Sequence, residues 1–225
     1  MCLIVLAWRV RPDLPLIVAA NRDEFHARPA EGARFWHDQP AILAGRDLQA
    51  GGAWLGVSRS GRFAAVTNYR GGGDPNAAQS RGVLVVNFLR NDFAPNNYIS
   101  SLNPASYSGF NLLLADRDEM WWFSNRDGGS HRLDPGSYGL GNFSLDTPEI
   151  SDSKQRFSDA IEHTPSIEPL FSVLAPSRIL APDYGTRCST VLIAERDGRT
   201  QFVERPFDAQ GTEGSTRRYE FRRAG

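Results

Sequence analysis

Lysine is almost missing from this chain, and charge of either sign is not in excess. Lys154 is the only lysine among 25 basic residues, and 26 acidic residues bring the formal net charge to -1 at pH 7. Such a balance gives no general attraction to nucleic acid or to an anionic membrane surface, so we expect no nucleic-acid partner. The exception is the C-terminal tail, with Arg217, Arg218, Arg222 and Arg223. A solvated edge strand explains that tail more simply than a binding patch.

Cysteine is equally scarce. Cys2 and Cys188 are the only two, with neither a CxxC motif nor metal-type spacing, which argues against both a zinc site and a disulfide framework. A single bridge between the two is left open. The histidines form no i, i+4 pair, which argues against a helical metal site; they are His26, His37, His131 and His163. We predict neither a metal nor a cofactor.

No long hydrophobic run is present. The opening apolar segment has no basic region before it and is interrupted by Arg9, Arg11 and Asp13. It therefore resembles neither a signal peptide nor a membrane span. We expect a cytoplasmic protein with no membrane span. The length of 225 residues allows one large core, and no linker divides the sequence, so we predict a single domain over residues 1–225.

Short apolar runs with strand and helix periods follow one another along the chain. The expected strands cover 2–10, 16–20, 54–57, 63–67, 110–115, 119–124, 131–133, 187–194, 200–206 and 216–222. The expected helices cover 80–91, 95–102, 153–163 and 167–174, with Ser80, Ser151 or Asp152, and Ser166 as N-caps. Strands in hairpin order with helices in pairs between them predict an α+β fold of antiparallel sheets covered by helices.

Cys2 follows the initiator methionine directly. Removal of Met1 would place a thiol and a free α-amine on one residue, and an α-amine titrates near pH ~8, so it can serve as the base for its own thiol. The alternative is a small buried residue at the start of a core strand, since Leu3-Ile4-Val5-Leu6 follows. Polar residues at the expected end of the second strand, Asn21-Arg22-Asp23-Glu24, favour a site.

This four-residue motif, together with Met1-Cys2, resembles the signature of the NRDE family, which includes the transport and Golgi organisation protein 2 homologues. Supporting segments occur in order along the chain: Ala44–Asp47, Gly51–Gly56, Thr67–Arg70, Ser80–Gly82, Gly109–Leu113, Gly139–Asn142 and Tyr184–Arg187. The family is similar in turn to N-terminal nucleophile (Ntn) hydrolases of the penicillin acylase and bile-salt hydrolase type. The resemblance implies a four-layer αββα sandwich, in agreement with the predicted α+β class.

By the same resemblance, Cys2 is the nucleophile, and Arg22 and Asp23 match the arginine and aspartate that those hydrolases place beside it. A guanidinium near a thiol lowers its pKa, and a carboxylate can hold the α-amine in position. The alternative for Arg22 and Asp23 is a loop salt bridge worth roughly 0–1 kcal/mol if exposed. Glu24 has no role in the hydrolase pattern.

Two asparagines and one further arginine complete the predicted site. Asn68 stands where an amide could donate to a developing oxyanion, and Asn142 could hold the substrate amide or share that role; ordinary turn asparagines are the alternative. Arg187 matches an arginine that the hydrolases direct into the site. If Arg187 points inward, period-two alternation turns Cys188 away, which disfavours a bridge to Cys2.

The leading hypothesis is an N-terminal-cysteine hydrolase of non-peptide, linear amide C–N bonds that acts through a thioester, with a small-molecule amide as substrate. The alternative comes from the family, whose members have been linked to haem trafficking and to Golgi and lipid homeostasis. Under that hypothesis the protein binds haem or another hydrophobic cargo, and Cys2 is a ligand or a relic. An identified substrate does not follow from a fold.

Overall fold

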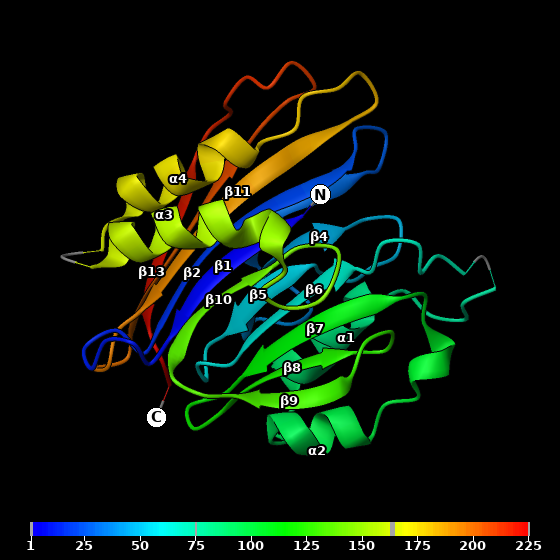
Figure 1. The fold of residues 1–225 in the computed structure, drawn as a ribbon, viewed down its shortest axis with the longest axis horizontal. Helices are drawn as coiled ribbons and strands as arrows, with labels where there is room; N and C mark the ends of the chain where they lie inside the picture. The colour runs from blue at the N-terminus through cyan, green and yellow to red at the C-terminus, as the bar shows by residue number, and fades with distance from the viewer. Residues whose placement is uncertain (1, 75, 163–164, 225) are drawn as a thin grey trace. The chain divides into compact units, whose positions relative to one another are not determined.

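The computed structural model describes residues 2–74, 76–162 and 165–224, which form two compact units (Figure 1). Unit 1 contains the chain up to Arg28, Pro135–Gly141 and Leu145–Arg222. Unit 2 contains Pro29–Asp134, the short segment Asn142–Ser144, and the chain from Arg223. The chain therefore crosses between the units several times. No helix among the described residues is long and apolar enough to cross a membrane.

Unit 1 is built on a six-stranded antiparallel sheet. Its strands in spatial order are β10 (Gly136–Leu140), β1 (Leu3–Trp8), β2 (Leu16–Phe25), β11 (Tyr184–Ala194), β12 (Arg199–Pro206) and β13 (Arg217–Arg222). Both β1 and the first part of β2 are continuously apolar and buried, as expected for strands covered on both faces. Alternate residues such as Leu3, Val5 and Ala7 join one hydrophobic cluster, because successive strand side chains point to opposite faces.

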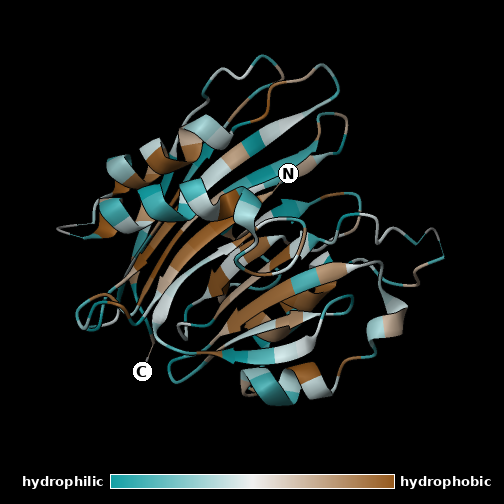
Figure 2. Ribbon diagram, viewed as in Figure 1, coloured by the Kyte–Doolittle hydropathy of each residue, from teal (hydrophilic) through white to brown (hydrophobic). Residues whose placement is uncertain are grey.

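Two helices pack on that cluster. They are α3 (Ser151–Ile161) and α4 (Ile167–Leu174), preceded by the 3₁₀ turn Pro148–Ile150 and followed by the 3₁₀ turn Ala175–Ser177. Phe157 and Ile161 lie one helical turn apart on α3, and Leu170 and Leu174 do so on α4, so each helix buries one apolar stripe. Figure 2 shows the alternation of hydrophobic and hydrophilic residues around both helices.

Unit 2 contains a seven-stranded antiparallel sheet whose spatial order follows the sequence. Its strands are β3 (Ala30–Phe35), β4 (Ile42–Asp47), β5 (Leu55–Ser58), β6 (Phe63–Asn68), β7 (Phe110–Ala115), β8 (Met120–Ser124) and β9 (Gly129–Leu133). Its helices are α1 (Gly82–Arg90), α2 (Pro95–Ser100) and the 3₁₀ turn Pro104–Ser106. Neighbouring strands are consecutive in sequence, and both helices lie in the long connection between β6 and β7.

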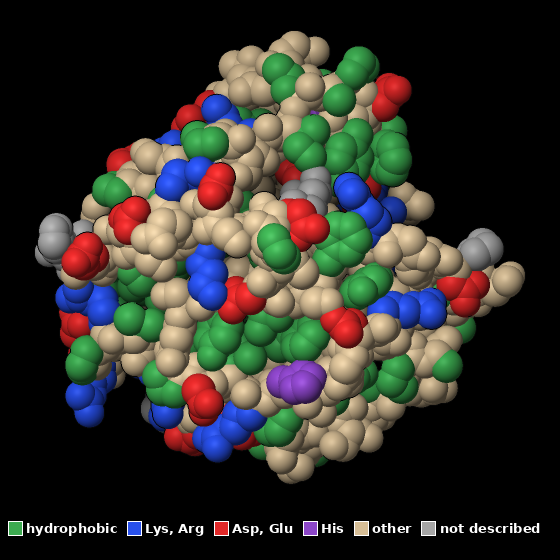
Figure 3. Space-filling model, in the orientation of Figure 1, with side chains coloured by type: hydrophobic (Ala, Val, Ile, Leu, Met, Phe, Trp, Pro, Cys, Tyr) green, Lys and Arg blue, Asp and Glu red, His purple; other side chains and the backbone are tan. Residues whose placement is uncertain are grey.

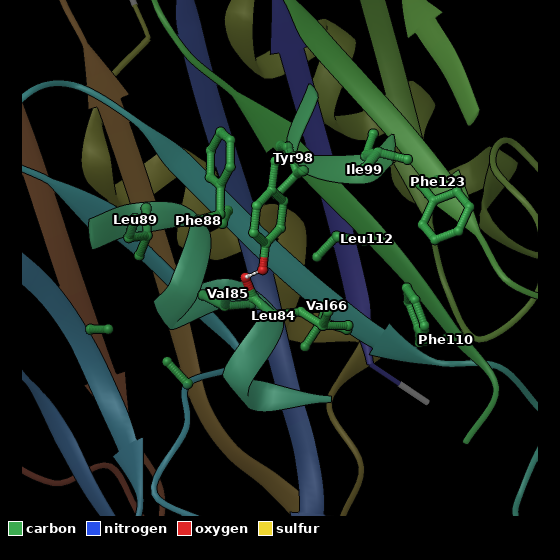
Figure 4. Close-up of a cluster of buried hydrophobic side chains, with 14 of the residues drawn as sticks. Val66, Leu84, Val85, Phe88, Leu89, Tyr98, Ile99, Phe110, Leu112 and Phe123 are labelled. Carbon is green, nitrogen blue, oxygen red and sulfur yellow. Dashed lines mark hydrogen bonds between the residues drawn. The ribbon is translucent and has the colours of Figure 1, made fainter. Parts of the chain in front are cut away.

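The helices of unit 2 share a core with one face of its sheet (Figure 4). Phe88 of α1 and Tyr98 of α2 lie with their ring centroids 5.4 Å apart, and the Tyr98 hydroxyl donates to the carbonyl of Leu84 at 2.8 Å. The buried guanidinium of Arg62 donates to the carbonyls of Phe88, at 3.1 Å, and Phe93, at 2.5 Å, near the end of α1. The bond to Phe88 reaches a carbonyl in the last turn of α1, where intrahelical donors run out, and the bond to Phe93 holds the chain that follows.

The two antiparallel sheets with helices confirm the predicted α+β class. All ten expected strands and four expected helices are present, but β3, β4 and β10 were not predicted. The cap assignments were less accurate: Arg81 rather than Ser80 is the N-cap of α1, and Ile150 rather than Ser151 or Asp152 is that of α3. Ser166 is the N-cap of α4, as predicted. His163, the expected end of α3, lies outside the described residues. The single domain over residues 1–225 stays a prediction.

One correction bears directly on the site. The second strand does not end at Asn21: β2 continues to Phe25, so the whole polar motif lies inside a strand. The reason is the partner strand, since β11 extends to Tyr184 and pairs with β2 through the motif. A strand continues through polar residues when a neighbouring strand supplies hydrogen bonds to its backbone.

Candidate active site

The register of β1 on β2 places the Cys2 thiol. Leu3 pairs with Asn21 across the two strands, so Cys2, one residue earlier, adjoins Arg22 and Asp23. The thiol donates to the Asp23 carbonyl, with sulfur and oxygen 3.5 Å apart. The Asp23 backbone N–H donates to the same sulfur at 3.4 Å. The thiol is therefore held by one residue of the motif on both its donor and its acceptor side.

Burial raises the pKa of the Cys2 thiol to about 11, and the negative charge of Asp23 acts in the same direction. The Asp23 backbone hydrogen bond and the positive charge of Arg22 lower the pKa, but by less. Only the thiolate is a strong nucleophile, so this thiol needs a proton acceptor at neutral pH.

We expect the alkylation of Cys2 by iodoacetamide to reflect this pKa. At pH 8 the thiolate population should be roughly 100-fold lower than that of an ordinary thiol, because burial raises the pKa of Cys2 to about 11. The rate should rise with pH up to about 11. The pKa of the Cys2 thiol is higher in the folded protein than in the unfolded chain, so the protonated thiol stabilises the fold. This contribution is fully present below the pKa of the unfolded chain and is lost as the pH rises through the folded-state pKa.

The measurement uses a Cys188→Ala protein whose N-terminal extension keeps Met1 in the chain. Mass spectrometry of the alkylated product gives the rate of alkylation at each pH. A half-maximal rate near pH 8.5 would contradict the effect of burial. Met1 itself lies outside the described residues.

Asp23 is buried and held by two side chains of β11. Thr186 lies opposite Asp23 in the strand register, and its hydroxyl donates to Asp23 Oδ1 at 2.6 Å. The Tyr184 hydroxyl donates to the Asp23 carbonyl at 3.2 Å, so that oxygen accepts from both Tyr184 and the Cys2 thiol. Neither Tyr184 nor Thr186 was predicted as a site residue, although both belong to one of the segments that supported the resemblance.

Arg22 lies between two thiols. Its side chain is only 11% exposed, and it adjoins Cys2 on one side and pairs with Cys188 of β11 on the other. One guanidinium nitrogen is 4.0 Å from Glu24 Oε2, and Arg28 approaches the same carboxylate oxygen at 3.9 Å. Glu24, which had no predicted role, therefore lies between two arginines. The positive charge of Arg22 lowers the pKa of both Cys2 and Cys188.

Both cysteines are free thiols. They lie on opposite sides of β2, and two strands that flank a third are roughly 10 Å apart, beyond the ~7 Å between Cα atoms that a disulfide tolerates. Burial raises the pKa of Cys188 well above its usual range, with Glu204 as a second cause. The bridge that the sequence left open is therefore absent.

Arg187 contacts the chain that follows β2. Its Nη1 donates to the carbonyls of Phe25, His26 and Arg28 at 3.0, 3.1 and 3.2 Å. The β2–β11 register shifts between Thr186 and Cys188, which leaves Arg187 as the extra residue of a bulge. Bulges redirect a side chain relative to regular alternation. A direct part for Arg187 in catalysis stays a prediction.

Asn68 and Asn142 belong to unit 2 and contact each other there. The Asn142 side-chain amide donates to the Asn68 carbonyl at 2.7 Å, and the Arg70 backbone N–H donates to the Asn142 carbonyl at 2.6 Å. Asn111, fully buried on β7, donates through Nδ2 to the Phe143 carbonyl at 2.7 Å. These bonds fasten residues 142–143 to the end of the unit 2 sheet. The roles of Asn68 and Asn142 as amide donors to the substrate stay predictions.

Asn21, the first residue of the motif, has a structural role. Asn21 is 0% exposed; its Nδ2 donates to the Leu174 carbonyl at 3.1 Å, and its Oδ1 accepts from the Ser189 hydroxyl at 2.6 Å. It thus joins the end of α4 to β2 and β11. The adjacent residues Arg22 and Asp23 are then held at defined places next to Cys2.

Comparison of the sequence with known proteins finds relatives over the full length of the chain. The family model described as Transport and Golgi organisation 2 matches residues 1–183. The Transport and Golgi organization protein 2 homolog of Bos taurus is 34% identical over 275 aligned positions, which cover 99% of this chain and 99% of that protein.

Two solved structures share the fold at low sequence identity. A Caenorhabditis elegans N-acylethanolamine-hydrolyzing acid amidase ortholog superposes with a TM-score of 0.62 at 13% identity, over 85% of this chain and 92% of that chain. The mutant C2A conjugated bile acid hydrolase from Clostridium perfringens superposes with a TM-score of 0.57 at 9% identity, over 99% and 98%. These similarities agree with the fold that the resemblance to Ntn hydrolases implied.

Proposed function

Because the chain belongs to the Transport and Golgi organisation 2 family and has the fold of an amidase and a bile acid hydrolase, we propose that it is an N-terminal-cysteine amidohydrolase. Its substrate is a non-peptide linear amide. The observation that carries this proposal is the Cys2 thiol held by the backbone N–H and carbonyl of Asp23. Both similar solved proteins are hydrolases by name, and one is a C2A mutant.

The proposed reaction begins when Met1 is removed and the α-amine of Cys2 becomes free. The raised pKa of the thiol requires a base, and this amine takes the thiol proton as sulfur attacks the amide carbonyl carbon. A C–S bond forms, and the tetrahedral intermediate carries the negative charge on oxygen. The C–N bond then breaks, and the proton on the α-amine passes to the leaving nitrogen.

Water completes the cycle. The free α-amine takes a proton from water as the water oxygen attacks the thioester carbonyl carbon. The C–S bond then breaks, the α-amine passes this proton to the departing thiolate, and the carboxylic acid leaves. Arg22 lowers the thiol pKa through its charge. Asp23 positions the sulfur through its backbone. We propose that its buried carboxylate, which accepts from the Thr186 hydroxyl, also orients the α-amine.

The alternative function, transport of haem or a lipid-like cargo, stays a prediction. A spectroscopic titration addresses it: a haem-binding protein should shift the Soret band of added haem.

The first test is the intact mass of untagged protein, paired with turnover of simple amides. We expect a mass short by one methionine and measurable amide hydrolysis. A matched protein that keeps Met1 behind an N-terminal extension should lose that hydrolysis, because its Cys2 has no free α-amine. Retention of Met1 in the untagged protein, or equal hydrolysis by the extended protein, would overturn the assignment of the base.

A further inference from the structure

We propose that Phe25 and Tyr184 form the surface that binds an uncharged, apolar group of the substrate next to the scissile bond. This inference rests on the proposed function and names its substrate class: amides that carry a hydrocarbon group without charge. Phe25 and Tyr184 would then determine specificity, while Cys2 performs the chemistry.

The first observation is the exposure of Phe25. It ends β2, two residues after Asp23, and is 59% exposed although it stands in a strand. A large aromatic side chain is costly to leave in water, and the full burial of a phenylalanine is worth about 1.5–3 kcal/mol. An exposed aromatic beside a nucleophile is a typical feature of an apolar binding surface.

The second observation is that Phe25 does not stand alone. Tyr184 pairs with it across β2 and β11, and the two rings meet edge to face with their centroids 5.3 Å apart. This is a favourable aromatic arrangement and gives the pair a defined shape. Leu180, which is 66% exposed, forms a backbone bridge with Gly185, the residue after Tyr184. Apolar side chains therefore gather on the two segments that meet here.

The third observation connects this surface to the thiol. The Tyr184 hydroxyl and the Cys2 thiol donate to the same carbonyl oxygen, that of Asp23. A phenol and a thiol that share one acceptor lie within a few ångströms of it, so the ring extends from the nucleophile toward Phe25. A group attached to the scissile carbonyl or nitrogen can lie along this path while the carbonyl carbon faces sulfur.

Several charged side chains near this surface have partners of their own. Glu24 lies between Arg22 and Arg28, and Nη1 of Arg187 donates to the backbone carbonyls after β2. Burial raises the pKa of Tyr184, so its phenol stays neutral. The rings of Phe25 and Tyr184 carry no charge themselves, and the exposed Asp183 beside Tyr184 is negative, so a substrate carboxylate placed against these rings would lose hydration without compensation.

The space-filling view agrees with this placement. Figure 3 shows hydrophobic side chains gathered at the upper right, where Figure 1 places the chain after β2 and the chain that leads into β11. Charged side chains border this patch. An apolar surface with a polar rim is typical of sites that bind small molecules.

The test is the binding of uncharged amides to the Cys2→Ala protein, which cannot turn them over. The probes are the N-methylamides of acetic, butanoic, hexanoic and octanoic acid, titrated by calorimetry. We expect the affinity to rise about threefold for each added methylene, somewhat less than full burial would give. The hexanedioic acid mono-N-methylamide, which ends in a carboxylate, should bind at least tenfold more weakly than the hexanoyl amide.

Phe25→Ala should remove most of the dependence on chain length. Phe93→Ala is the matched control, because Phe93 is 56% exposed and lies in unit 2; it should leave the dependence unchanged. Tyr184→Phe keeps the ring and should preserve the dependence, whereas Tyr184→Ala should weaken it.

Equal affinity for all chain lengths, equal behaviour of Phe25→Ala and Phe93→Ala, or no binding of any amide would overturn the inference. The proposed function fails separately, if the unmodified protein hydrolyses no amide although the Cys2→Ala protein binds the series as expected.

Discussion

Cys2→Ala abolishes amide hydrolysis, with a fall in kcat of about 10⁴-fold or more. The reason is that no other group in the proposed reaction forms the covalent bond to the carbonyl carbon, and loss of a nucleophile removes the whole acyl-transfer route. Cys2→Ser should be almost as inactive, because a hydroxyl is far less ionised than a thiol at the same position. The measurement is turnover of an amide substrate, with intact mass to establish that Met1 is absent from each protein.

Cys188→Ala is the matched control. Cys188 is the other free thiol, pairs with the same Arg22, and is buried. Its loss removes one sulfur from the core but no step of the reaction, so kcat should stay within about threefold. Thermal unfolding should show that Cys2→Ala remains folded. If Cys2→Ala kept its activity, or if both variants lost activity equally, Cys2 would not be the nucleophile.

Asn21→Ala lowers the free energy of unfolding by about 3 kcal/mol. The substitution removes a side chain that bonds the Leu174 carbonyl and the Ser189 hydroxyl in a fully buried place. Two buried polar partners then lose their bonds, and each costs ~1–3 kcal/mol when left unsatisfied. Urea unfolding of the purified protein measures the change. Activity should also fall, because Asn21 fastens the strand that carries Arg22 and Asp23.

Two variants separate this effect from a general effect of substitution. Ser189→Ala removes one of the two bonds and should cost about 1 kcal/mol. Asn68→Ala replaces an exposed asparagine of unit 2 and should change the stability by less than about 0.5 kcal/mol. A loss for Asn21→Ala no larger than for Asn68→Ala would mean that Asn21 does not connect α4 to the sheet.

Much of the fold follows from local patterns. The short apolar runs that form β7 and β8, and the helical spacing in α1 and α4, depend on neighbours a few residues apart, so the sequence alone predicts them. The strands β3 and β10 were missed because their burial is incomplete and their composition is mixed. Pairing with β4 and β1 supplies the hydrogen bonds that make them strands.

The candidate site, too, was predictable from the sequence only in part. The motif at residues 21–24 and the position of Cys2 directed attention to the residues of unit 1 on which the proposal rests, because thiol, guanidinium and carboxylate groups are recognisable by type. The distinction within the motif was not predictable. Asn21 has a structural position, whereas Asp23 contacts the thiol, and that difference follows from which neighbouring strand each residue faces.

The sequence by itself determined the α+β class, the family and the thiol on which the proposal rests. Only the tertiary structure decided that β2 runs through the motif, that the cysteines are separated by a strand, and that Tyr184 and Thr186 hold Asp23. Tyr184 and Asp23 are 161 residues apart in the chain. Strand register brings such residues together, and register is set by pairing between distant segments, which no local period encodes.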